Sequence, residues 1–211
     1  MESLFITVEG TDGAGKSTQI EYLKEFLQTK EFTVTITREP GGTRISEKIR
    51  NIILDKNNIE MSDRTEALLY AASRAQHVEE TIVPALRRGD IVICDRFVDS
   101  SMVYQGRGRS LGYEAVKIIN DFATGQLEPD LTILFDVKPE ISLKRINAKK
   151  KGDRLEREKL SFHQEVHNGY RDLAKMFPNR IIRIDASRSV KQIRKDIELI
   201  IENLLSTKEN T

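Results

Sequence analysis

The sequence predicts an α/β fold in which helices cover both faces of a parallel β-sheet. Five short apolar runs alternate along the chain with longer stretches whose apolar residues recur at helical spacing. Each run is nearly continuous, whereas a sheet with one solvated face would show alternating polar residues. Strands that alternate with helices favour parallel connections. Since no linker-like stretch or internal repeat interrupts this order, we expect residues 1–211 to form a single domain.

The first two predicted strands are each followed by a turn and a helix. Leu4 to Val8 is apolar and β-branched and ends at a glycine-rich turn. Phe32 to Thr37 is the second run, which Pro40-Gly41-Gly42 ends. Another helical stretch begins at about Arg64 and continues into the eighties. The apolar positions at helical spacing after the two turns are Ile20, Leu23, Phe26 and Leu27, and then Ile45, Ile49, Ile52 and Ile53.

Three further strands are expected at Ile91 to Cys94, at Leu131 to Val137 and at Arg180 to Ile184. Pro139 follows the fourth strand and suits the first turn of a helix. The last helix carries an apolar stripe that we expect to pack on the sheet, formed by Val190, Ile193, Ile197, Ile200, Ile201 and Leu204.

The composition excludes several classes of partner. Because 34 basic side chains nearly balance 33 acidic ones, no overall field favours nucleic acid or an anionic membrane, and we expect neither as a partner. The chain has no run of about 18 apolar residues and no signal-peptide pattern, so a soluble, cytoplasmic protein is expected. Cys94 is the only cysteine, which excludes an internal disulfide and fits a buried strand position in a reducing compartment.

The residues Gly10-Thr11-Asp12-Gly13-Ala14-Gly15-Lys16-Ser17 match the pattern GxxxxGK[ST] between a predicted strand and a predicted helix. Glycines let backbone N–H groups approach phosphate oxygens, and the helix offers its positive N-terminus. Lys16 can reach the β- and γ-phosphates, Ser17 can bind Mg²⁺, and Thr18 adds another hydroxyl. The motif therefore predicts a P-loop NTPase fold with a nucleoside triphosphate and Mg²⁺.

Asp95 and Arg96 follow the third strand, where a carboxylate would lie beside the P-loop and orient Mg²⁺ directly or through water. An ordinary ion pair at a strand end is the alternative. Arg38 follows the second strand and can meet a second phosphate at the same sheet edge, although Pro40-Gly41-Gly42 also suits a simple turn. Arg50, Arg74 and Gln105 are further candidates for the cleft, and each alone could be a surface side chain.

His163 and His167 are spaced i, i+4, so they could share a metal ion. The intervening Gln164-Glu165 does not give the HExxH zinc pattern. A solvated helix face is the interpretation that we favour for this pair.

Taken in order, several segments closely resemble the signatures of bacterial thymidylate kinases, and the resemblance extends over nearly the whole chain. The segments are Glu9 to Ser17, Thr37-Arg38-Glu39-Pro40-Gly41-Gly42-Thr43, Arg64 to Arg74, Asp95-Arg96-Phe97, Asp99-Ser100-Ser101 and Tyr104-Gln105-Gly106. The resemblance implies transfer of the γ-phosphoryl group of ATP to dTMP, giving dTDP and ADP in dTTP biosynthesis. It also implies a five-stranded P-loop kinase fold and a homodimer.

The resemblance also implies roles for individual residues. Arg38 and Arg96 would hold the 5′-phosphate of dTMP with support from Arg50, and Asp12 would reach the 3′-hydroxyl. Tyr70 stands where the family usually stacks a phenylalanine on thymine, and Tyr104 would crowd a ribose 2′-hydroxyl. Arg74, Ser101 and Gln105 would address the base edge, while Arg145 would pack on adenine.

The interior of the P-loop, Thr11 to Ala14, has no basic residue that could help neutralise the transferring phosphoryl group. The resemblance directs the search for this cation to a lid predicted at about 144–157. We favour Arg154, then Lys149, although a basic loop in solvent is the alternative for such a run. With Lys16, Asp95 and Arg96, one of these would complete a direct in-line transfer.

Two other functions share the P-loop. A kinase for another nucleoside monophosphate would differ only in its acceptor. A nucleotide-dependent switch protein would hydrolyse ATP or GTP slowly, but the guanine-specific NKxD pattern is missing from the sequence.

Overall fold

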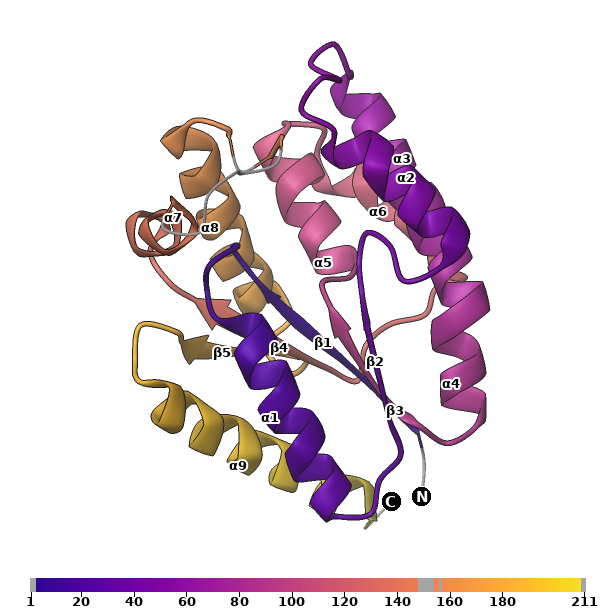
Figure 1. Ribbon diagram of the computed structural model, residues 1–211, viewed down its shortest axis with the longest axis vertical. Helices are drawn as coiled ribbons and strands as arrows, with labels where there is room; N and C mark the ends of the chain where they lie inside the picture. The colour runs from indigo at the N-terminus through magenta and orange to yellow at the C-terminus, as the bar shows by residue number, and fades with distance from the viewer. Residues whose placement is uncertain (1–2, 148–153, 156, 210–211) are drawn as a thin grey trace.

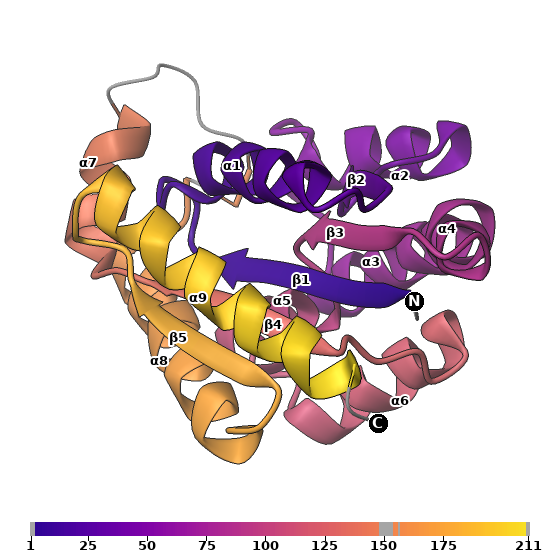
Figure 2. The ribbon, with the colours of Figure 1, turned by 90° about the horizontal axis from the view of Figure 1, so that it is seen from below.

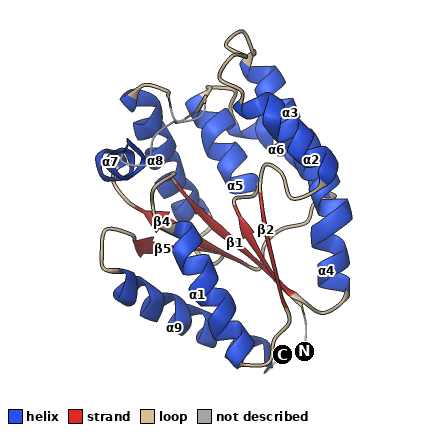
Figure 3. Cartoon of the chain, in the orientation of Figure 1, coloured by secondary structure: helices blue, strands red, loops and turns tan. Residues whose placement is uncertain are grey.

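The computed structural model describes residues 3–147, 154–155 and 157–209. Its centre is a five-stranded sheet in the order β2-β3-β1-β4-β5, and every neighbouring pair of strands is parallel. Figure 3 shows the strands as a red core surrounded by blue helices. The predicted α/β fold is therefore confirmed, with strands at β1 (Leu4–Gly10), β2 (Val34–Arg38), β3 (Ile91–Asp95), β4 (Leu131–Asp136) and β5 (Ile181–Asp185).

The sheet register gathers the predicted functional segments at one edge. Asp95 of β3 pairs with Val8 of β1 on one side and with Arg38 of β2 on the other. Gly10, the last residue of β1, pairs with Phe135 of β4. Because the strands are parallel, their carboxyl ends form a common edge, where open α/β folds bind their ligands.

Helices cover both faces of the sheet, and alternating strand residues point to opposite faces. On one face, Ile6 and Ile93 pack with Leu23 of the first helix and Ile197 of the last. On the other face, Phe5 packs in a separate cluster with the segment around residues 78–85. Figure 2 shows α1 on one side of β1, and α5 and α8 on the other. The nearly continuous apolar strands are thus explained by burial on both faces.

Figure 1 shows the helices in their order along the chain, with both termini at the same end of the molecule. No helix of the described ranges is both long and apolar enough to cross a membrane. The helical elements are α1 (Lys16–Thr29), α2 (Arg44–Leu54), α3 (Asp63–His77), the π-helical segment η1 (Val78–Ile82), α4 (Val83–Arg87), α5 (Val98–Ser101), the π-helical segment η2 (Met102–Gly108), α6 (Tyr113–Thr124), α7 (Pro139–Asn147), α8 (Leu160–Met176) and α9 (Val190–Glu209).

The predicted helices are found at α1, α2, α7 and α9, and the stretch from Arg64 into the eighties is divided into α3, η1 and α4. The periodicity did not predict α5, η2 and α6, and of α8 only a helix face at His163 and His167 was expected. Gly106, Gly108 and Gly112 interrupt the pattern there. A wider π-helical turn also shifts the spacing of apolar residues away from that of an α-helix.

Candidate active site

The P-loop connects β1 to α1, and its first glycine is required by a close approach of two strands. Gly10 has φ = 133°, and a Cβ at this position would lie 2.7 Å from the carbonyl oxygen of Phe135. The chain therefore turns tightly at the sheet edge before α1 begins at Lys16. The N-terminus of α1 then faces the loop with backbone N–H groups, an arrangement that attracts anions.

Lys16 lies folded against the loop. Its Nζ donates to the carbonyl oxygens of Gly10 at 3.2 Å and Thr11 at 3.4 Å, and it lies 3.7 Å from Asp95 Oδ1. Burial lowers the pKa of Lys16, and the like charge of Arg96 lowers it further. Ser17 and Thr18 are exposed beside it at the first turn of α1.

Asp95 offers an oxygen that a cation or its water could use. Asp95 Oδ1 is buried and has no hydrogen-bond partner among the residues that the structure describes. Carboxylate and hydroxyl oxygens are the ligands that Mg²⁺ prefers. This oxygen of Asp95, which has Lys16 as an ion-pair partner but accepts no hydrogen bond from the described residues, is chemically suited to Mg²⁺, and so is the hydroxyl group of Ser17.

Arg96 is held in an unusual backbone conformation, with φ = 72°, at the end of β3. Its Nη2 donates to Asp12 Oδ1 at 2.9 Å, and its Nη1 donates to the hydroxyl groups of Ser100 and Tyr170, each at 3.1 Å. Although burial opposes the shift, Arg96 and then Lys16 lower the pKa of Asp12 to about 2. Arg96 thus joins the P-loop to the helices behind the sheet.

A buried carboxylate orients the two hydroxyl groups that meet Arg96. Glu9 Oε2 accepts from Ser100 at 2.6 Å and from Tyr170 at 2.8 Å. Both hydroxyl protons then point to Glu9, so their lone pairs are left for Arg96. Burial raises the pKa of Glu9 to about 7, and the neighbouring Asp99 raises it too. Sequence reasoning assigned Glu9 no role beyond its place in the family signature.

One pocket lies at the carboxyl edge of the sheet, between the P-loop, the ends of β2 and β3, and the helices α2 and α3. It brings together all nine residues that the sequence assigned to the acceptor, together with Asp95. It also includes five residues to which the sequence assigned no role: Glu39, Pro40, Leu54, Ser100 and Leu155. The nine are Asp12, Arg38, Arg50, Tyr70, Arg74, Arg96, Ser101, Tyr104 and Gln105.

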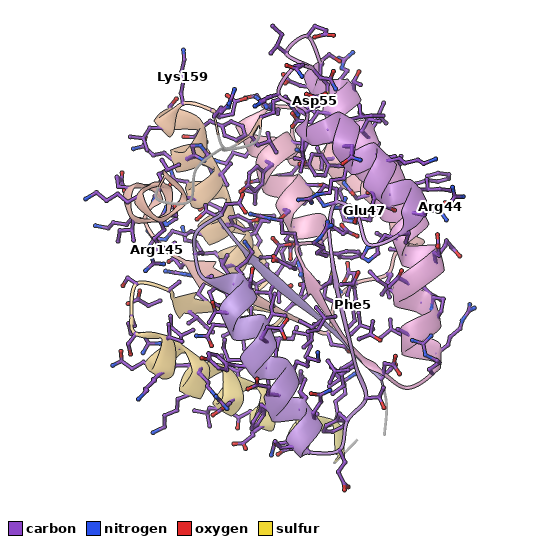
Figure 4. All side chains as sticks on the ribbon, in the orientation of Figure 1. Phe5, Arg44, Glu47, Asp55, Arg145 and Lys159 are labelled. Carbon is purple, nitrogen blue, oxygen red and sulfur yellow. The ribbon has the colours of Figure 1, made fainter. Side chains whose placement is uncertain are left out.

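Two guanidinium groups converge on one side of this pocket. Arg38 Nη1 and Arg50 Nη1 both donate to the carbonyl oxygen of Pro40, at 2.8 and 2.7 Å. Glu47 of α2 accepts from Arg38 Nη2 at 2.9 Å, and Figure 4 labels Glu47 on this helix. With Arg96 also lining the pocket, three guanidinium groups give this region the charge and the fork geometry that suit a phosphate.

The deepest guanidinium of the pocket is held by neighbours of several kinds. Arg74 is 1% exposed and donates to Glu39 Oε2 at 2.7 Å, to Ser101 Oγ at 3.0 Å and to the carbonyl oxygen of Phe97 at 3.0 Å. A further bond goes to Asn120. These contacts fix the direction of the Arg74 side chain, so it can discriminate among bound groups without prior rearrangement.

The basic residues near the predicted lid lie in different places. Arg145 of α7 donates to the carbonyl oxygens of Gly13 at 3.2 Å and Ala186 at 3.4 Å, which sets it beside the P-loop (Figure 4). Arg154 instead donates to Glu66 Oε2 at 2.5 Å and to the carbonyl oxygen of Ile53 at 3.0 Å. Lys149 lies outside the described residues.

The solvated helix face predicted for His163 and His167 is wrong. His163 is buried and packs edge-on against Phe162, at 5.8 Å between ring centroids. His167 Nε2 pairs with Asp136 Oδ1 at 2.8 Å. Because α8 packs this face against the end of β4, the two residues serve structural contacts within the fold.

A family sequence model described as "Thymidylate kinase" matches residues 8–197. A thymidylate kinase from Lactobacillus delbrueckii subsp. bulgaricus is 55% identical over 196 residues, covering 92% of this chain and 92% of the relative. Another, from Pediococcus pentosaceus, is 51% identical over 209 residues, covering 98% of this chain and all of the relative.

The fold is also similar to a crystal structure of thymidylate kinase from Ehrlichia chaffeensis, with a TM-score of 0.77 and 31% identity. That match covers 95% of this chain and 99% of the other. Agreement in sequence and in fold thus extends over nearly the whole molecule, and the chain belongs to the thymidylate kinase family.

Proposed function

We propose that residues 1–211 act as one kinase domain that transfers the γ-phosphoryl group of ATP to dTMP, giving dTDP and ADP. The observation that carries this proposal is the pocket in which the acceptor residues expected from the sequence meet Asp95 beside the P-loop. Membership of the thymidylate kinase family supports the same acceptor.

On the donor side, the segment Gly10 to Thr18 holds the triphosphate of ATP. Lys16 neutralises its β- and γ-oxygens, and Arg145 packs beside the adenine. The hydrogen bond from Arg145 to the carbonyl oxygen of Gly13 in the P-loop supports this position beside the adenine. Ser17 and Asp95 would hold Mg²⁺, directly or through water, and the ion would supply positive charge to the phosphate oxygens when bound.

On the acceptor side, Arg38, Arg50 and Arg96 bind the 5′-phosphate of dTMP. Asp12, which already accepts from Arg96, takes the 3′-hydroxyl group. Tyr70 stacks on thymine and Tyr104 excludes a 2′-hydroxyl. The base edge is addressed by Arg74, Ser101 and Gln105.

The reaction that we propose is direct. An oxygen of the dTMP phosphate attacks the γ-phosphorus in line with the bond to ADP, which breaks as the new P–O bond forms. Lys16 and Arg96 offset the negative charge between the two substrates. No covalent intermediate on the protein is required, because both substrates reach the same sheet edge.

Substituting Lys16 tests the donor side of the proposal. Lys16→Ala should lower kcat by about 100-fold or more, since the lysine acts where charge develops during transfer. Lys195→Ala is the matched control, because Lys195 is exposed on α9 away from the pocket. Near-normal dTMP phosphorylation by the Lys16→Ala variant would contradict the assignment of the P-loop.

A panel of nucleoside monophosphates tests the acceptor side of the proposal. The rates at which ADP and the corresponding nucleoside diphosphate form would be measured with dTMP, dUMP, UMP, CMP and dGMP under one assay condition. We expect dTMP to give the highest kcat/KM. A preference for another monophosphate would identify a different acceptor, and ATP turnover indifferent to all of them would favour the switch protein.

We also propose that two copies of the chain pair through α3 and α6, and that the enzyme acts in the cytoplasm. Phe122 and Ile118 of α6 are 91% and 62% exposed, and Leu68 of α3 is 57% exposed. Apolar side chains gathered on a surface are typical of an interface between subunits. The family resemblance, which implies a homodimer, supports a second copy as the occupant.

A further inference from the structure

Glu66 of α3 is a fully buried carboxylate at the meeting point of three side chains. Its Oε1 accepts from Gln105 Nε2 at 2.9 Å and from Arg109 Nε at 3.3 Å. Its Oε2 accepts from Arg109 Nη2 at 3.1 Å and from Arg154 Nη2 at 2.5 Å. Burying a carboxylate is costly unless a positive charge balances it and its oxygens accept hydrogen bonds, and both conditions are met at Glu66.

The network around Glu66 contains charges of both signs. Arg109 also pairs with Glu158 at 2.7 Å and with Asp63 at 3.5 Å. Although burial opposes the shift, hydrogen bonds from Arg109 and Gln105 lower the pKa of Glu66. The carboxylate is therefore ionised in the folded protein at neutral pH.

The first arm of the network leads to the amide of Gln105. An ionised carboxylate can only accept hydrogen bonds, so the amide nitrogen of Gln105 must face Glu66. The amide oxygen and the second N–H group are then left for the pocket, which Gln105 lines. An amide fixed in this way presents an acceptor to a base that carries an imide N–H group.

The second arm leads to the chain segment at Arg154 and Leu155. Arg154 spans Glu66 of α3 and the carbonyl oxygen of Ile53 in α2. The next residue, Leu155, is buried and lines the same pocket as Gln105. Arg154 is not itself among the residues that line the pocket in the described part of the chain.

We propose that Glu66 is a positioning residue for acceptor binding, which holds the Gln105 amide and, through Arg154, the Leu155 side chain in the pocket wall. Arg154 is then also a positioning residue, and it is not the cation that meets the transferred phosphoryl group. The proposal rests on the assignment of this pocket to dTMP. It adds that the hydrogen bonds of Glu66 fix the shape and the polarity of the pocket.

Arg154→Met separates the positioning role from the catalytic one. If Arg154 positions Leu155, the Kd for dTMP should rise about fivefold, while kcat and the Kd for ATP stay within about threefold of the original values. Binding would be measured by calorimetry and turnover by ADP release. A fall in kcat of about 100-fold with an unchanged Kd for dTMP would instead identify Arg154 as the catalytic cation and overturn the proposal.

The matched control is Lys159→Met, which removes one positive charge from the same region. Lys159 is exposed next to α8 and points into solvent (Figure 4). This variant should leave dTMP binding unchanged. Equal weakening of dTMP binding by both substitutions would mean that general charge, rather than the bond to Glu66, supports the pocket, and would overturn the proposal.

Glu66→Gln tests the first arm, because a glutamine can donate as well as accept and releases the Gln105 amide to turn over. The ratio of kcat/KM for dTMP to that for dCMP should fall at least about fivefold, since cytosine carries an acceptor where thymine carries N3–H. Asp63→Asn is the control, since it removes a charge that also pairs with Arg109 and lies on the protein surface. It should keep the original ratio.

Circular dichroism and the melting temperature would verify that each variant folds. An unchanged dTMP to dCMP ratio in folded Glu66→Gln would overturn the proposal. Failure of the pocket assignment would look different, because the original protein itself would then show no preference for dTMP.

Discussion

At the scale of single residues, Arg96 combines a strained backbone with a dense set of partners. A positive φ is unfavourable for a residue with a Cβ, and such strain persists only where surrounding contacts hold it. Bonds to Asp12, Ser100 and Tyr170 supply that hold. The conformation directs the guanidinium from the end of β3 into the acceptor pocket.

Arg96→Lys should lower kcat/KM for dTMP about 100-fold, because an ammonium group cannot make the forked contacts of a guanidinium. Steady-state kinetics with dTMP varied would measure the change. Arg183→Lys is a suitable control, since Arg183 lies on β5 and pairs with Asp136 at the surface. A loss smaller than about threefold in Arg96→Lys would contradict a direct role in acceptor binding.

The sequence predicted which residues would meet in the pocket better than it predicted how each is held. Arg38, Arg74 and Arg96 could be proposed because they belong to short signatures at predicted strand ends or helices. The partners of Arg74 and the pairing of Arg154 with Glu66 join residues that are 23 or more positions apart. Local spacing carries no signal for such contacts, since they depend on how the helices pack.

At the scale of elements, the side chain of Asp136 links β4 to α8 and to β5. Asp136 accepts from His167 of α8 at 2.8 Å and from Arg183 of β5 at 2.6 Å. The hydrogen bond from His167, followed by that from Arg183, lowers the pKa of Asp136 from 3.8 to about 2 against the opposing effect of burial. A carboxyl group with a lowered pKa stabilises the fold above its unfolded value, and this contribution is lost as the pH falls through the folded value.

Asp136→Asn should therefore lower the free energy of unfolding by about 2 kcal/mol at pH 7 and by roughly half of that at pH 3. Urea unfolding at the two pH values would measure the difference. Asp121→Asn is the control, because its exposed i, i+4 pair with Lys117 should contribute less than about 0.5 kcal/mol. Equal destabilisation by Asp136→Asn at both pH values would argue against an ionic contribution.

Some of the helical segments that the periodicity missed approach one another closely through glycine. A Cβ on Gly169 of α8 would lie 2.9 Å from Val103 of η2, so this glycine permits contact between the two helical segments. Packing through small residues leaves fewer large apolar side chains in the pattern. The strands were easier to predict, because burial on both faces gives each a continuous apolar run.

At the scale of the whole molecule, strand order separates the two substrates that we propose. β1 and its P-loop lie at the centre, with β3 and β2 on the acceptor side and β4 on the other. The alternation of strands and helices predicted a parallel sheet but not this order, which follows from contacts between distant strands. The sequence also could not show that apolar residues of α3 and α6 are exposed. An apolar helix stripe that packs on a core has the same pattern as one that contacts a second copy of the chain.

Phe122→Glu should weaken the proposed dimer about tenfold or more, because a charge would replace a large apolar side chain at its interface. Analytical ultracentrifugation over a range of concentrations would measure the association. Leu199→Glu places the same charge on an exposed apolar position of α9 and should leave the association unchanged. If Phe122→Glu assembled like the original protein, the interface would have to lie elsewhere.

The strained backbone of Arg96 also sets a limit for anyone who wishes to make this enzyme more heat-resistant. Glu31, Ser110 and Gln126 share its positive φ and are exposed, so glycine at each could raise the free energy of unfolding by up to about 1 kcal/mol. The same change at Arg96 would relieve similar strain, but it would remove the guanidinium from the pocket. Three of these four sites are therefore open to stabilisation, while at the fourth a more durable protein would be a less active one.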